Sequence, residues 1–171
     1  MLSENLKKNN RLTLIYYISV ILFLLIQSSV FIKYISITNF HPNTLLVLLI
    51  IFSLNNNFKD SFKFSLFIGI FKDLLNPNYI LLDLPIYILY LFLIQILKGG
   101  IVSTNVLNRV LVAGFIIVLD FIIRNTILYF ELGDINIEPI AIVHILVDIS
   151  LFFLFDRIFS LISKKLNKYE F

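Results

Sequence analysis

The chain has no cysteine, no tryptophan and only two histidines among its 171 residues. The missing thiols exclude a disulfide, a thiolate metal site and a cysteine nucleophile. With so few imidazoles, a transition-metal site would depend on carboxylates alone. The sequence also lacks the HExxH, GxSxG and GxxxxGKS/T patterns of metalloproteases, serine hydrolases and P-loop proteins. We therefore predict a protein that is not an enzyme, with no catalytic site, no cofactor and no metal.

Charge is scarce as well, because only 15% of the residues are charged and 59% are hydrophobic, with a mean hydropathy of +0.94. Soluble domains carry roughly a quarter charged residues, which cover their surface, so this composition excludes an ordinary soluble fold. The isoelectric point near 9.1 is not a sign of nucleic-acid binding. The basic residues stand beside apolar runs, as membrane topology requires, and form no long basic patch.

Six apolar segments are candidates for membrane-spanning helices. A hydrocarbon core of about 30 Å needs about 20 helical residues to cross it. The segments cover approximately residues 12–32, 42–57, 61–75, 79–97, 106–130 and 137–163. The first is too long for a signal-peptide core and no cleavage motif follows it, so we predict that it is retained. The predicted fold is an all-α bundle of six transmembrane helices, forming one integral membrane domain over residues 1–171.

The loop charges predict the orientation of this bundle. If each segment crosses once, ten basic residues fall on one side: Lys7, Lys8, Arg11, Lys59, Lys63, Lys98, Arg109, Lys164, Lys165 and Lys168. The other side receives Lys33 alone among the loop cations, together with three acidic residues. Because basic loops stay in the cytoplasm, both termini are predicted to be cytoplasmic. Because this one-sided distribution of basic residues requires all six crossings, it supports the short second and third segments as membrane-spanning helices.

The stretch SLFIGIFKDLLNPN places charge inside an apolar run. Ser65, Gly69 and Asp73 are spaced four apart and therefore share one helix face, on which small residues let another helix approach closely. A carboxylate facing lipid costs at least ~2.5 kcal/mol, so Asp73 should point into the bundle or reach the interface. Lys72 could extend to lipid head groups or pair with another carboxylate. Both a buried packing site and two interfacial charges are compatible with this pattern.

Further charges occur in the last two segments. Asp120 and Arg124 have the favourable spacing and order for an ion pair within one helix. Asp148 is expected at a similar depth, so Arg124 could bridge the fifth and sixth segments. Structural pairing that fixes these two helices is the preferred interpretation, and a proton relay through His144 and Asp148 is the alternative.

Two blocks of the sequence resemble the MreD family, the small multi-pass membrane proteins of the bacterial rod-shape system. HPNTLLVLLIIFSL is similar to that family's Pro-(Asp/Asn)-apolar start of the second helix, and Pro42 and Asn43 carry this pattern. SLFIGIFKDLLNPNYILLDLPIYILYLFL is similar to its block of spaced small residues followed by an aspartate and an aromatic-rich helix. Gly69 and Asp73 carry that pattern. Ser65 stands where the family has a first glycine, and NPNYILLD replaces the glycine usual after the aspartate.

The resemblance covers about a third of the chain, roughly residues 42–98, and implies a role and partners. It implies a non-enzymatic scaffold in the bacterial cytoplasmic membrane that works with MreC. Through MreC it would act with the MreB filaments and the peptidoglycan synthases of the elongation complex. Apart from membrane lipid, no small-molecule substrate is expected.

A second class of membrane protein has the same size, basicity and number of helices. It is the substrate-binding subunit of energy-coupling-factor vitamin transporters, for which Asn125, Tyr129 and Glu138 could line a pocket. Those subunits dock through Ala-x-x-x-Ala patterns, whereas this chain has only Ala113 and Ala141. A channel or transporter with an ion path along Asp120, Arg124 and Asp148 ranks last, since no repeats or paired broken helices are found.

Overall fold

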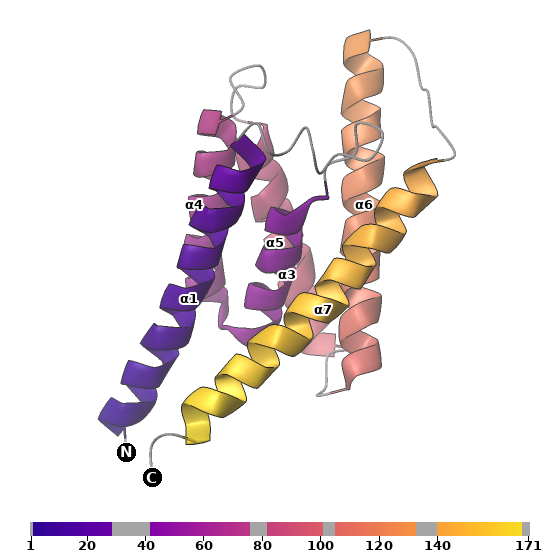
Figure 1. The fold of residues 1–171 in the computed structure, drawn as a ribbon. Helices are drawn as coiled ribbons and strands as arrows, with labels where there is room; N and C mark the ends of the chain where they lie inside the picture. Colours follow the sequence, from indigo (N-terminus) through magenta and orange to yellow (C-terminus); the bar gives the residue numbers. More distant parts are fainter. Residues whose placement is uncertain (1, 29–41, 76–81, 101–104, 133–139, 169–171) are drawn as a thin grey trace.

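The computed structural model describes residues 2–28, 42–75, 82–100, 105–132 and 140–168, and every element in these ranges is a helix. In chain order the helices are α1 (Leu2–Ser28), α3 (Thr44–Asn55), α4 (Phe58–Leu75), α5 (Asp83–Gly100), α6 (Val106–Leu132) and α7 (Ile140–Lys168) (Figure 1). The predicted all-α class is confirmed, and each predicted segment has one matching helix.

The helix boundaries differ from the predicted ones in an instructive way. α1 begins ten residues before the predicted start and α7 continues through the basic residues that follow its apolar part, because hydropathy locates only the apolar part of a helix. Pro42 does not lie in the first turn of α3 as predicted. Asn43 is the N-cap, accepting a hydrogen bond from the Leu46 N–H at 3.4 Å. Some terminal parts of the predicted segments lie outside the described residues, namely 29–32, 79–81 and 137–139. The predicted break between two segments at 76–78 also lies outside them.

The short helix α3 is the centre of the bundle. Every residue from Thr44 to Leu54 is buried, and the helix packs against each of the other five. A helix that is apolar on all sides needs such surroundings, since it has no polar face to offer to water. Its 12 residues correspond to a length of about 18 Å, so it spans only part of the length of the helices around it.

Aromatic rings fill the part of this core that lies between α1, α3, α4 and α7. Tyr16 stacks on Phe159 with ring centroids 4.1 Å apart, and Phe52 stacks on Phe64 at 4.0 Å. The edge of Tyr16 meets Phe52 at 5.0 Å. These contacts join α1, α3, α4 and α7, and they are the offset and edge-on geometries that aromatic pairs prefer.

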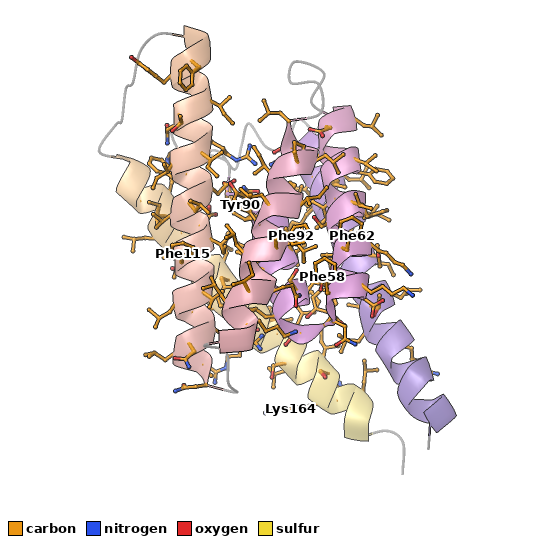
Figure 2. All side chains as sticks on the ribbon, turned by 180° about the vertical axis from the view of Figure 1, so that it is seen from behind. Phe58, Phe62, Tyr90, Phe92, Phe115 and Lys164 are labelled. Atoms are coloured by element: carbon orange, nitrogen blue, oxygen red, sulfur yellow. The ribbon has the colours of Figure 1, made fainter. Side chains whose placement is uncertain are left out.

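The outer surface is unusually apolar. Large hydrophobic side chains are exposed on every helix except α3, among them Phe58, Phe92 and Phe115, which are labelled in Figure 2. Within the described part of the chain, one helix is long and apolar enough to cross a membrane by length and composition, the segment Val106–Ile127 of α6, with a mean hydropathy of 2.3. Only 28% of its most apolar stretch is buried.

Candidate functional site

Polar and charged side chains gather where α3 begins. This cluster, here called the polar network, consists of Asn43, Lys72, Asp73, Asp83, Tyr87, Tyr90, Asp120, Arg124 and Asp148. Its four carboxylates are between 3% and 8% exposed. Removing a carboxylate from water costs several kcal/mol unless other groups pair with it, so the contacts of each member decide whether the network can exist.

Arg124 holds two of these carboxylates. Its Nε donates to Asp120 Oδ1 at 2.9 Å, which confirms the ion pair predicted from their spacing within one helix. Its Nη2 donates to Asp83 Oδ1 at 2.7 Å. The predicted bridge from Arg124 to Asp148 is wrong. The guanidinium joins α6 to the amino end of α5 and not to α7.

Asn43 occupies the space that this predicted bridge would have crossed. Its side-chain Nδ2 donates to Asp120 Oδ2 at 2.9 Å, and its backbone N–H donates to Asp148 Oδ1 at 3.1 Å. Because the cap of α3 lies between these two carboxylates, it links α6 and α7 in place of the arginine. The Tyr90 hydroxyl, also visible in Figure 2, donates to Asp120 Oδ1 at 3.0 Å.

Lys72 points into the network rather than to the outside. Its ammonium lies 3.2 Å from Asp83 Oδ1 and donates to the Tyr87 hydroxyl at 2.9 Å. That hydroxyl in turn donates to Asn43 Oδ1 at 3.3 Å. Of the two predicted positions for Lys72, the structure therefore has the one in which the lysine pairs with a carboxylate.

Asp73 and Gly69 together fix the start of α5 against α4. Asp73 Oδ1 accepts from the Asp83 N–H at 2.9 Å and Oδ2 from the Leu84 N–H at 3.0 Å. These are backbone donors that the first turn of a helix leaves free. A Cβ on Gly69 would lie 2.8 Å from Leu84 Cα, so only glycine permits this approach. Ser65 is fully buried on the same face. Of the two interpretations of this stretch, burial is correct, and Asp73 is a cap supplied by a neighbouring helix.

The two ends of α3 carry opposite charges. Asp120 and Asp148 contact its cap at the amino end, where the helix dipole favours anions. At the carboxyl end, Lys98 donates to the carbonyl oxygens of Ser53 and Asn56 at 3.2 and 2.7 Å. Cations are favoured there for the same reason. The surrounding helices thus hold α3 by charges that complement its dipole.

No role was predicted for three members of the network, namely Asp83, Tyr87 and Tyr90. Their spacing of four and then three residues places them on one face of α5, and this pattern was the available signal. His144 is half-buried on α7, one turn before Asp148, and a relay through it stays a prediction. Within the described ranges, no group of three or more potential ligand side chains could hold a metal ion.

The contacts within the network are extensive. Both oxygens of Asp73 and both oxygens of Asp120 accept hydrogen bonds. The arrangement therefore joins α4, α5, α6, α7 and the cap of α3 through ionic and polar contacts. Comparison of the chain with protein-family models, with curated proteins and with solved structures finds no match in any of the three.

Proposed function

We propose that the chain is a multi-pass protein of the bacterial cytoplasmic membrane, with its six helices crossing the bilayer as one bundle. The support is an arrangement that suits lipid: carboxylates lie inside, while large apolar side chains such as Leu107 and Phe115 are 65% and 53% exposed. An apolar surface of this extent would cause association in water. Charged groups within lipid must face protein partners, as those of the polar network do.

The charges at the ends of the bundle support a cytoplasmic location for both termini. α1 begins and α7 ends at the same end (Figure 1). Lys98, Arg109 and Lys164 lie close to this end, on α5, α6 and α7. The positive-inside rule assigns such an end to the cytoplasm. α3, with 12 residues, is much shorter than the hydrocarbon core, and its position is fixed by the helices that pack around it.

Within that membrane, the protein is proposed to be a non-enzymatic scaffold of the rod-shape system, as its resemblance to the MreD family implies. One observation carries this proposal. The two blocks of the resemblance meet in space, because Asn43 and Lys72 contact the same Tyr87 hydroxyl. Gly69 and Asp73 fix α4 and α5 beside that point. A bundle fixed in this way would present a constant surface to MreC and, through MreC, to MreB and the peptidoglycan synthases.

The features expected of a vitamin carrier are not brought together. The Asn125 amide donates to the Phe121 carbonyl of its own helix at 2.8 Å, and Tyr129 is 43% exposed. Glu138 lies outside the described residues. Ala113 is fully buried, so it cannot contribute to a docking surface. These positions favour the scaffold over the carrier.

Depletion in a rod-shaped or spiral host tests the proposal. Loss of a scaffold of the elongation complex should make the cells round, and the protein should co-purify with MreC. Re-expression of the chain with Lys165→Gln, a change at an exposed residue, should restore the shape and serves as the control. Growth that fails only without an added vitamin, in cells that keep their shape, would instead identify a carrier.

A further inference from the structure

A second polar site lies at the opposite end of α3, away from the polar network. It is a pocket of about 460 Å³ between α1, the end of α3, the start of α6 and α7. This volume is within the range of about 300–1,000 Å³ for ligand sites. Its walls include the apolar side chains of Leu12, Tyr16 and Phe159, and its polar lining includes Arg109, Ser160, Ser163 and Lys164.

α7 contributes five residues to this lining, and three of them are Ser160, Ser163 and Lys164. Ser160, Ser163 and Lys164 have the spacing of three and four residues that places side chains together. None of the three makes a hydrogen bond or ion pair within the described residues. Helical serines commonly donate to the carbonyl one turn earlier, as Ser150 does to Leu146 at 2.7 Å, so the two free hydroxyls of this face are available to a ligand.

Arg109 adds a cation from the facing helix. It is paired with Asp156, and its Nη1 donates to Asn55 Oδ1 at 3.1 Å. The guanidinium has five N–H donors, and its buried Nε has no acceptor. With two cations against one carboxylate that is already paired, the pocket has an excess of positive charge and of hydrogen-bond donors. Such an excess selects an anion, and oxygen-rich anions such as phosphate suit it best.

We propose that this pocket binds the phosphate of an anionic phospholipid from the cytoplasmic leaflet. The apolar walls would contact the first carbons of the acyl chains, while Lys164 and the serine hydroxyls bind the phosphate oxygens. This inference rests on the proposed membrane location, because only there does the pocket lie at the level of lipid head groups. A soluble phosphate compound shares the same chemistry and is the alternative source of the anion.

The test is a binding measurement on the purified full-length protein. Native mass spectrometry from detergent, with phosphatidylglycerol or phosphatidylcholine added, gives the affinity for each lipid. Phosphatidylglycerol should bind more tightly. Lys164→Gln should weaken its binding about five-fold, the equivalent of about 1 kcal/mol for one basic residue near an anionic lipid surface. Lys165→Gln removes the same charge from the adjacent exposed residue, outside the pocket, and should change the affinity less than two-fold.

Three results would overturn the proposal. They are equal binding of the two lipids, equal effects of the two lysine substitutions, and full displacement of the lipid by millimolar glycerol phosphate, which would assign the pocket to a soluble ligand. A second variant, Ser163→Leu, fills the pocket without changing the charge and should also weaken phosphatidylglycerol binding. The measurement needs no cell-shape phenotype. A failed depletion experiment would therefore refute the scaffold role and leave this result intact.

Discussion

The close approach of α4 and α5 at Gly69 leads to a prediction for the stability of an alanine variant. In this prediction the effect of packing can be separated from the effect of helix propensity. In Gly69→Ala, the new Cβ would lie 2.8 Å from Leu84 Cα and 2.9 Å from Leu84 Cδ1. The backbone contact cannot be relieved by a side-chain rotation, so the two helices must move apart. Overpacking of this kind costs about 1–3 kcal/mol. Separation of the helices would also lengthen the hydrogen bonds from the start of α5 to Asp73.

Gly114 supplies the matched control. It also lies inside a helix, and in Gly114→Ala the added Cβ has its nearest neighbour, Ile149 Cδ1, at 3.8 Å, an ordinary van der Waals distance. Both substitutions gain the same helix propensity, about 0.8–1.0 kcal/mol. This gain cancels in the difference between the two variants. We therefore expect Gly69→Ala to be less stable than Gly114→Ala by about 1–3 kcal/mol.

The free energy of unfolding of each full-length variant can be measured by reversible unfolding in mixed detergent micelles. The loss of helical circular dichroism reports the unfolding. The more stable variant should be Gly114→Ala, at or above the stability of the unmodified protein. Equal stability of the two alanine variants would show that α4 and α5 are not in backbone contact at this position. The explanation of the glycine–aspartate pair would then be refuted.

Losses of stability are also expected in the same assay when Asp73, Arg124 or Lys98 is replaced. Asp73→Leu leaves two backbone donors of α5 without acceptors and should cost about 2–4 kcal/mol, whereas Asp73→Asn keeps one acceptor and should cost less; equal losses would contradict the cap. Arg124→Met leaves the buried carboxylate of Asp120 without a cation and that of Asp83 with Lys72 alone, so it should cost about 3–5 kcal/mol, and adding Asp83→Asn should recover part of the loss. A purely additive double variant would refute that ion pair. Lys98→Met removes the donor to the Asn56 carbonyl at the end of α3, while the Ser53 carbonyl keeps its hydrogen bond from Gln95; it should cost about 1–3 kcal/mol, against no change for Lys165→Gln.

The sequence predicted those features of the fold and site that depend on spacing within one helix. The shared face of Ser65, Gly69 and Asp73 and the pair of Asp120 with Arg124 both follow from the helical repeat. Apolar runs located the six helices of the described residues, because apolar length is the property that a hydropathy pattern measures.

Contacts between helices could not be predicted in the same way, because they depend on how each helix is rotated against its neighbours. A similar depth along the helices predicts a contact of Arg124 with Asp148, yet the cap of α3 lies between Asp120 of α6 and Asp148 of α7. The central position of α3 in the bundle could not be predicted from the sequence either. Its residues are apolar on all faces, and such a pattern indicates burial without indicating which helices surround it.

The membrane topology of the bundle is the central claim, and the absence of cysteine allows a direct test by single introduced thiols. Cysteines at Lys59, Asn105 and Lys165 should react with a membrane-impermeant maleimide only after the cells are permeabilised. A cysteine at Phe130, at the other end of α6 and 80% exposed, should react in intact cells. Labelling of Lys59→Cys and Lys165→Cys from opposite sides of the membrane would contradict the six-helix arrangement and the function proposed from it.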